Sequence, residues 1–185
     1  MRFFLPLAIT LLASCASDPQ PTPEPYEFIG VQLGANRVIF PANLASQVRF
    51  LGYESSDYWT PSEQEVLALD ARLADLLREA MANPASVDPW VEKNPDSANW
   101  IRTETQQIVD HLPEFRRQFA GIVDGEGHKR ILVRGFPSPE ATDGFDFPRW
   151  REEIVCVSDG GFWYWYAVYD LETGKLVRLS SNGYA

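Results

Sequence analysis

The sequence predicts one α+β domain, in which a long amphipathic helix and a shorter one pack on a four- to five-stranded antiparallel meander. Two observations predict this fold. Between residues 60 and 111, apolar side chains recur at spacings of three and four, the spacing of one face of a helix. From Glu114 onward, apolar and polar residues alternate between turn sequences, as they do in half-buried strands. Helices followed by consecutive strands are typical of α+β domains, because each layer covers the apolar face of the other.

The first residues resemble the export signal of a bacterial lipoprotein. A positive start at Arg2 is followed by an apolar run ending in Leu12-Ala13-Ser14-Cys15, which resembles the lipobox of this family. The resemblance implies that residues 1–14 are a signal peptide and that Cys15 becomes the lipidated first residue, with acyl chains such as palmitate. Since Ala16 and not Asp follows Cys15, the family's sorting rule implies the outer membrane, with the domain facing the periplasm. The alternative is an ordinary secretory signal that leaves Cys15 as a free thiol.

Behind this cysteine the chain divides into a tether and one domain. Residues 15–25 are rich in proline, which favours an extended backbone of about 3.1 Å per residue and a reach of roughly 30 Å. Residues 26–185 have the length and apolar content of a single globular domain. No later apolar stretch is long enough for a transmembrane helix. Residues 26–58 carry only short apolar groups, which indicate either short strands or packed loop.

Two helices are expected. Thr60-Pro61-Ser62-Glu63 predicts a helix start with Thr60 as the N-cap, Pro61 at the first helical position and an acid at the third. Asn83-Pro84 predicts its end. The apolar face expected between them consists of Val66, Leu69, Leu73, Leu76, Leu77 and Ala80. A shorter helix is expected from Ser97 to about His111, capped by Asp96 or Ser97.

The second half of the chain predicts two hairpins and a last strand. Residues 115–136 form the first, with its turn at residues 124–127, and residues 137–149 form a loop. Residues 154–157 are expected to resume a strand and to turn at Asp159-Gly160-Gly161 into residues 162–169. A turn at residues 170–174 then leads into a last strand at residues 175–181. The layout is similar, as a topological analogy, to the cystatin and nuclear-transport-factor-2 folds.

Charge and cysteine content exclude some functions. The formal net charge is −10, and removal of residues 1–14 takes away Arg2 and no acid. Nucleic acid is therefore not expected as a partner, since the basic clusters Arg116-Arg117 and His128-Lys129-Arg130 both fit strand surface. Cys156 lies between two valines in a predicted strand, which favours a buried, inert thiol over a nucleophile with His111 or His128 as its base.

The sequence assigns no catalytic residue, metal or cofactor. The histidines and cysteines lack the spacing of a zinc site. Asp143 and Asp146 lack the alternating acids of a calcium loop and are expected to be solvated. Gly125-Glu126-Gly127 fits a turn between strands and not a phosphate-binding loop. The common serine-hydrolase motifs do not occur.

The strand at residues 162–169 is apolar on both faces. Alternation places Trp163, Trp165 and Tyr169 on one face, together with Ala167. The strand is either a core strand covered on both sides, which we favour, or it presents these three aromatic residues as a candidate binding surface. Aromatic side chains supply rigid, amphipathic area at recognition surfaces.

Several segments resemble a group of small, exported, uncharacterised bacterial proteins. They are residues 58–63, Arg117-Gln118-Phe119-Ala120-Gly121, residues 159–163 and Asn182-Gly183-Tyr184-Ala185. The resemblance implies one α+β domain that ends at the C-terminus, and it transfers no catalytic residue. The favoured hypothesis is a membrane-anchored, non-enzymatic binding module with an envelope protein or glycan as its partner. The alternatives are a small hydrolase or isomerase with its site between helix and sheet, an inhibitor of a basic hydrolase such as lysozyme, and a structural envelope component.

Overall fold

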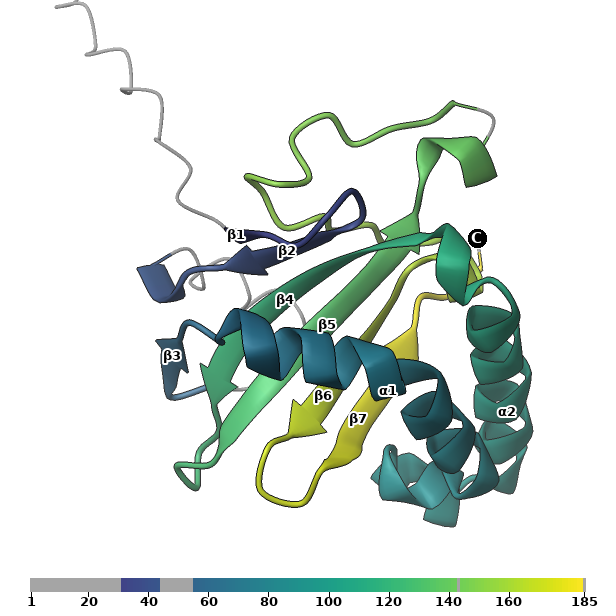
Figure 1. Ribbon diagram of the computed structural model, residues 1–185. Coiled ribbons are helices and arrows are strands. Elements are labelled where there is room, and N and C mark those ends of the chain that lie inside the picture. Colours follow the sequence, from purple (N-terminus) through teal and green to yellow (C-terminus); the bar gives the residue numbers. More distant parts are fainter. Residues whose placement is uncertain (1–30, 44–54, 143, 185) are drawn as a thin grey trace, which may run out of the picture.

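A mixed β-sheet with two α-helices on one face forms the domain (Figure 1). The computed structural model describes residues 31–43, 55–142 and 144–184, so the lipobox-like segment, Cys15 and the tether lie outside the described residues. The helices are α1 (Glu63–Ala82) and α2 (Pro95–Asp110). The strands are β1 (Val31–Gln32), β2 (Arg37–Phe40), β3 (Asp57–Trp59), β4 (Phe115–Val123), β5 (Lys129–Pro137), β6 (Trp165–Asp170) and β7 (Lys175–Ser181). The α+β class is as predicted.

Helix α1 ends where it was predicted to end, but its N-cap is a different residue. The N-cap is Ser62 and not Thr60: the Ser62 hydroxyl accepts from the backbone N–H of Glu65, and the Glu65 carboxylate accepts from the N–H of Ser62. This capping box is more complete than the expected one because Glu65 reaches back to the cap, so the helix begins two residues later than predicted. Its predicted apolar face is confirmed, and the buried residues are Val66, Leu69, Leu73, Leu76, Leu77 and Ala80.

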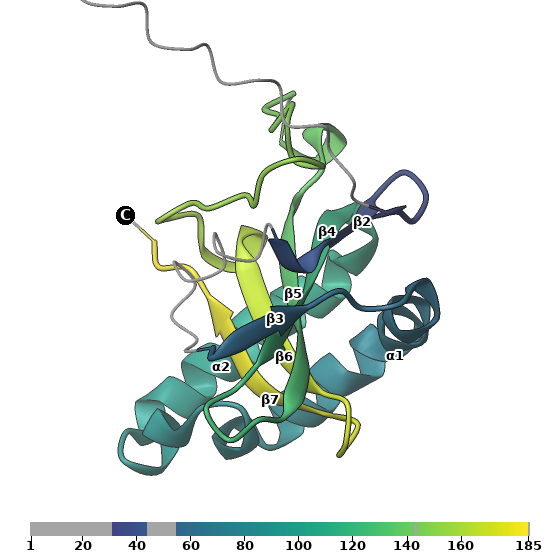
Figure 2. The same cartoon turned by 90° about the vertical axis from the view of Figure 1, so that its left-hand side faces the viewer.

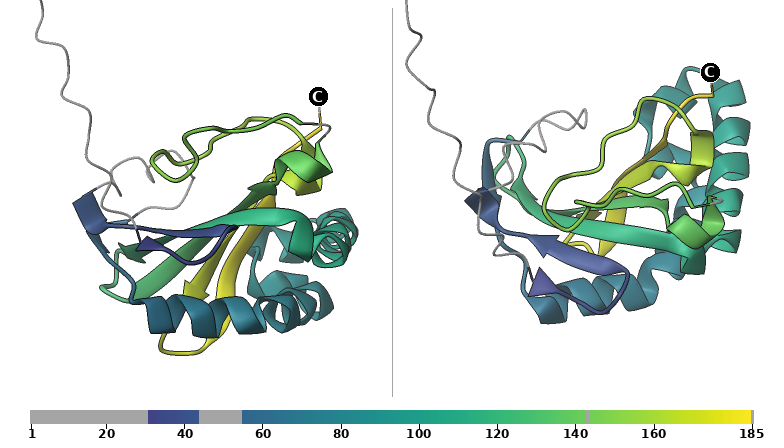
Figure 3. Two further views of the ribbon diagram at one scale, coloured as in Figure 1. Left: turned by 45° about the horizontal axis from the view of Figure 1, so that its top comes forward. Right: turned by 90° about the horizontal axis from the view of Figure 1, so that it is seen from above.

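Helix α2 begins two residues earlier than predicted. Pro95 occupies its first turn, and Asn94 is the cap position, with no side-chain hydrogen bond. The prediction that Asp96 or Ser97 caps this helix is therefore wrong: a proline without an N–H serves the helix start without a side-chain cap. The two helices pack against each other and lie on the same side of the sheet (Figure 3).

The sheet is not purely antiparallel, which corrects the prediction. Strands β4, β5, β6 and β7 form the expected antiparallel meander, but β2 pairs in parallel with β4, from Arg37 opposite Arg117 to Phe40 opposite Ala120. Strand β3 pairs antiparallel with the other half of the same edge of β4 (Figure 2). The parallel pairing is possible because the chain returns from β2 to β4 through both helices, and parallel neighbours need such a long connection.

A side-chain ion pair fastens the helix layer to this edge. Asp70 of α1 lies 2.6 Å from Nε of Arg37 on β2 and 2.8 Å from Nε of Arg117 on β4. Burial lowers the pKa of the Arg117 guanidinium, with Asp70 acting in the opposite direction. The contact joins three elements that are far apart in the sequence.

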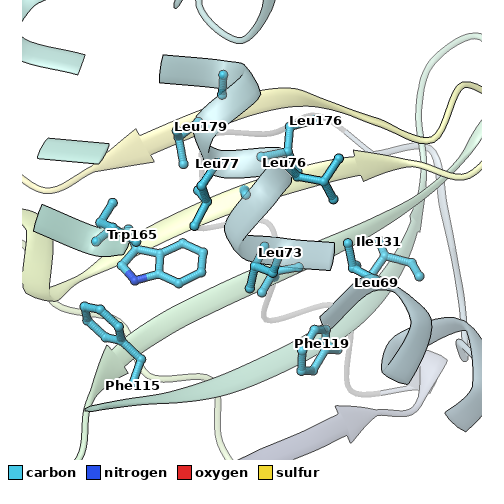
Figure 4. Close-up of a cluster of buried hydrophobic side chains, with 14 of the residues drawn as sticks. Leu69, Leu73, Leu76, Leu77, Phe115, Phe119, Ile131, Trp165, Leu176 and Leu179 are labelled. Carbon is cyan, nitrogen blue, oxygen red and sulfur yellow. The ribbon is translucent and has the colours of Figure 1, made fainter. Parts of the chain in front are cut away.

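Two apolar clusters lie on opposite faces of the sheet. On the helix side, leucines of α1 meet Phe115, Phe119 and Trp165 (Figure 4). On the other side, the long segment between β5 and β6 lies over the sheet (Figure 3). Its residues Trp150 and Val155 belong to one apolar cluster with strand residues such as Phe136. A loop, and not a second layer of helix, therefore covers the second face.

The predicted strand at residues 154–157 is wrong, and with it the second hairpin. These residues have no regular structure, and Gly161–Trp163 form a 3₁₀ turn before β6 begins at Trp165. The N–H of Val155 donates to the side chain of Gln118 instead of to a strand. An apolar run can cover a sheet as a loop as well as form a strand, and periodicity alone does not separate the two.

Candidate functional site on the loop-covered face

A row of polar side chains crosses the face that the loop covers. Gln118 of β4 lies opposite Arg134 of β5, which lies opposite Tyr166 of β6. Residues directly opposite one another in adjacent strands share a face of the sheet. Gln118 and Arg134 are buried, with 3% and 5% of their surface exposed. Polar groups so deep in an otherwise apolar layer require partners, and these partners define the site.

Gln118 ties the covering loop to the sheet. Its amide nitrogen donates to the carbonyl oxygens of Trp150, at 2.5 Å, and Glu153, at 2.7 Å. Its amide oxygen accepts from the N–H of Val155 at 3.0 Å. One side chain thus satisfies three backbone groups of a segment without secondary structure, which is how a loop can be buried without leaving its backbone unpaired.

Trp150 is the apolar anchor of the same loop. Its surface is 2% exposed, and its ring packs edge-on against Phe136 with centroids 5.8 Å apart. The guanidinium carbons of Arg116 and Arg151 lie 5.1 and 4.4 Å from the ring centroid, within cation–π range. Arg116 also pairs with Asp146, so that acid belongs to an ion pair and is not merely solvated. Asp143 lies outside the described residues.

Aromatic rings lead from this core to the surface. Phe145 meets Phe147 edge-on at 5.2 Å, and Phe147 meets both Phe136, at 5.6 Å, and Tyr164, at 6.1 Å. Phe145 is 59% exposed, so the outer end of this series faces solvent. Large exposed aromatic side chains next to a packed aromatic group are common in binding surfaces.

The loop also lines a hollow of about 300 Å³ that is open to solvent. Its lining comes from one continuous stretch of the loop: Phe147, Pro148, Arg149, Trp150, Glu153, Ile154, Val155 and Cys156. Arg149 pairs with Glu152 at 3.1 Å and with Glu153 at 2.7 Å, which places a fixed charge pair beside apolar walls. The volume matches the lower end of small-molecule sites.

Cys156 is exposed, which corrects the prediction of a buried thiol. The physical reason is the missing strand: in the irregular chain Val155 turns into the apolar layer and Cys156 turns outward. Burial lowers the pKa of the Arg134 guanidinium, and Cys156 and Tyr166 act in the opposite direction.

Arg134 is a buried cation without a carboxylate partner. Among the described residues its Nη1 atom has no hydrogen-bond partner, and no ion pair of the described chain includes it. A buried charge without a partner of opposite charge destabilises a folded protein. The presence of Arg134 at this position therefore indicates a functional site. The sequence could not predict that Cys156 lies near Arg134. Arg134 is on β5 and Cys156 is in the covering loop, and the path of that loop over the sheet cannot be derived from the sequence.

The aromatic residues proposed as a binding surface lie on the helix-covered face. Trp165 is 1% exposed and packs edge-on against Phe115 with centroids 5.8 Å apart (Figure 4). Trp163 and Tyr169 are partly buried and pack against the same cluster. Trp165 is thus part of the core and offers no surface to a partner.

The two histidines pair elsewhere. His111 lies 2.9 Å from Glu114 and stacks on Phe162, whereas His128 lies 3.3 Å from Asp124 at the turn between β4 and β5. The structure therefore brings Arg134, and neither histidine, to Cys156. Within the described ranges no group of three or more acids, histidines or cysteines is arranged to hold a metal ion.

Comparison with known proteins leaves this geometry as the main guide to function. No protein-family model, no curated protein and no solved structure matches the chain. In the part of the chain that the structure describes, neither helix is long and apolar enough to cross a membrane.

Proposed function

We propose that the chain is a lipoprotein of the cell envelope, anchored in the outer membrane through Cys15, whose domain is a non-enzymatic binding module. The lipobox-like sequence and the proline-rich tether support the anchoring. The loop-covered face supports binding: one observation, the hollow of about 300 Å³ next to exposed Phe145, carries this part of the proposal. An envelope protein or glycan is the expected partner.

The space between helices and sheet favours binding over catalysis. The alternative, a small hydrolase or isomerase, would need its site there, but the leucines of α1 and the aromatic residues of β4 and β6 fill this space (Figure 4). The helices on one face of a meander support the topological analogy with the cystatin and nuclear-transport-factor-2 layouts, which carries no activity with it. The lysozyme-inhibitor variant rests on the acidic net charge alone.

The anchoring half of the proposal is tested by mass and fractionation. Wild-type protein and a Cys15→Ala variant are expressed in a diderm bacterium and separated into membrane and soluble fractions. We expect the wild type in the membrane, with a mass increased by acyl chains, and the variant uncleaved at this site and without lipid. An unmodified Cys15 thiol in the wild type would contradict the proposal.

The binding half is tested by photocross-linking. A benzophenone amino acid replaces Phe145 on the loop-covered face or, as a control, Leu67, which is 47% exposed on α1. We expect a discrete cross-linked envelope component from position 145 and none from position 67, since the two side chains lie on different layers of the domain. The same cross-linked products from both positions, or no product from position 145, would contradict the binding half of the proposal.

A further inference from the structure

The C-terminal segment holds the far end of the covering loop. The side-chain amide of Asn182 donates to the carbonyl oxygens of Val157, at 2.5 Å, and Asp159, at 3.0 Å. Gly183 forms a parallel β-bridge with Asp159, and its carbonyl oxygen accepts from the N–H of Gly161 at 3.1 Å. These loop residues lie outside the named strands, so the C-terminal segment supplies the partners that their backbone needs.

Tyr184 extends this contact to the helix layer. Its hydroxyl donates to both carboxylate oxygens of Glu104 on α2, at 3.1 and 3.3 Å. Its ring lies against Gly161, where an added Cβ would overlap the ring. Residues 182–184, called the C-terminal strap below, therefore tie the loop on one face of the sheet to a helix on the other face.

The buried carboxylate of Glu104 favours the bound strap. Glu104 is 6% exposed, and no ion pair within the described ranges includes it. It accepts hydrogen bonds from the hydroxyls of Tyr184 and of Ser181, at 3.2 Å, and both come from the end of the chain. A buried carboxylate that loses its hydrogen bonds is destabilised, so departure of the strap is unfavourable but not prevented.

The strap lies where it can separate from the domain without disturbing the sheet. The pairing of β7 with β6 ends at Ser181, one residue before the strap begins. Tyr184 is 62% exposed, and Gly183 is exposed as well. Local opening concentrates at chain ends whose backbone is exposed and weakly paired, and it leaves the core folded.

We propose that the C-terminal strap is a conformational switch that controls access to the loop-covered face. Bound to α2, it holds residues 156–161 over the sheet; when it separates, this stretch lifts while the rest of the domain stays folded. Lifting uncovers apolar surface, because Val157 and Tyr166 pack against the apolar cluster on this face. It also widens the hollow, whose lining ends at Cys156 beside the strapped stretch. The switch goes beyond the proposed binding function and does not depend on which partner is bound.

Hydrogen exchange of the full chain, followed by NMR, is the first test. Tyr184→Phe keeps the ring but removes the hydroxyl that bonds α2. We expect the Gly161 amide, which donates to the strap, to exchange about fivefold faster, the factor of one lost hydrogen bond, with β4 and β5 unchanged. Tyr58→Phe is the matched control, because the Tyr58 hydroxyl has no hydrogen-bond partner in the part of the chain that the structure describes. It should leave the Gly161 amide unchanged. Unchanged exchange of Gly161 in Tyr184→Phe, or equal acceleration of Gly161 and the central strands, would overturn the proposal.

Deletion of residues 182–185 tests what separation of the strap uncovers. We expect the shortened chain to bind the hydrophobic dye anilinonaphthalene sulfonate with several-fold higher fluorescence than the wild type. Its far-UV circular dichroism and the cooperativity of its urea unfolding should be kept, because only the end of the loop opens. A shortened chain that unfolds would show that the strap is part of the core fold and not a switch. A folded one that binds no more dye than the wild type would equally refute the proposal.

Discussion

At the scale of single residues, Gln118 shows how much structure one side chain can organise. A glutamine in a strand is an unremarkable feature of a sequence, and nothing in its spacing indicates that it satisfies the carbonyls of Trp150 and Glu153 and the N–H of Val155. Yet these bonds decide that residues 150–155 cover the sheet as loop. The position of Cys156 follows from them.

Replacement of Gln118 by Met should destabilise the domain strongly. The change keeps the volume but removes the partner of three backbone groups, two of them buried and the Glu153 carbonyl partly buried, at a cost of about 1 kcal/mol for each and so about 3 kcal/mol in total. Urea unfolding measures this. The control Gln106→Met removes one exposed hydrogen bond, to Asp110, and should cost only a few tenths of a kcal/mol. Similar losses in both variants would contradict the anchoring role.

Asp124 links stability to acid pH. Burial raises its pKa, but bonds from the N–H groups of His128 and Glu126 and from the Arg130 guanidinium outweigh this and lower the pKa from 3.8 to about 2. Because the folded state binds the proton more weakly than the unfolded state, the stabilisation is complete above the unfolded pKa. It is lost as the pH falls through the folded value.

We therefore expect Asp124→Asn to flatten the acid dependence of stability. Between pH 3.8 and about 2, the free energy of unfolding of the wild type should fall more steeply than that of the variant, whose amide keeps an oxygen for the turn but does not titrate. Urea titrations at a series of pH values measure the two slopes. Parallel slopes for the wild type and Asp124→Asn would refute the linkage.

At the scale of elements, helices and hairpins could be predicted where periodicity and turn chemistry agree. The apolar spacing of α1 located every buried residue on it, and the glycine turns located the hairpins of β4 with β5 and of β6 with β7. The parallel pairing of β2 could not be predicted, since a four-residue strand carries too little pattern to specify a partner eighty positions away. The ion pair of Asp70 with Arg117 could not be predicted either, because it depends on where α1 lies across β4.

The candidate site was the least predictable part. Its polar row depends on the register of β4, β5 and β6, and its thiol depends on a loop that resembles a strand in sequence. The aromatic alternation in β6 did separate two faces correctly, with Trp165 towards the helices and Tyr166 away from them. What the alternation could not reveal is what covers each face.

A glycine in β5 makes room for the largest side chain of this core. Gly135 lies opposite Trp165, and a Cβ at this position would overlap the indole ring. We expect Gly135→Ala to displace Trp165 and to cost about 1–3 kcal/mol, the range of overpacked cores, in thermal or urea unfolding. Gly125→Ala is the matched control, because the space around Gly125 is open. A Gly135→Ala variant as stable as this control would show that the ring is free to move.

At the scale of the whole molecule, the two faces of the sheet are covered by layers of different kinds. The helix layer is regular and joined to the sheet by many leucines and by Asp70. The loop layer lacks repeating backbone bonds, and individual side chains such as Gln118 and Trp150 hold it to the sheet. Segments with fewer regular hydrogen bonds open more easily, and binding sites are often drawn from them. The hollow and Cys156 lie on this weaker layer.

Hydrogen exchange should resolve the two layers. Amides of β4 and β5, paired along nine residues each, should exchange only through global unfolding, whereas the Val155 amide, which donates to Gln118, should exchange through local opening and hence faster. In Gln118→Met the loop should lose protection by a larger factor than β4 and β5 do. Occupation of the hollow by a ligand should slow exchange at Val155 and leave the central strands unchanged, because a ligand stabilises the layer that it contacts. Equal protection of Val155 and β4 in the wild type would instead mean that loop and sheet open together, and the binding face would then be as rigid as the core.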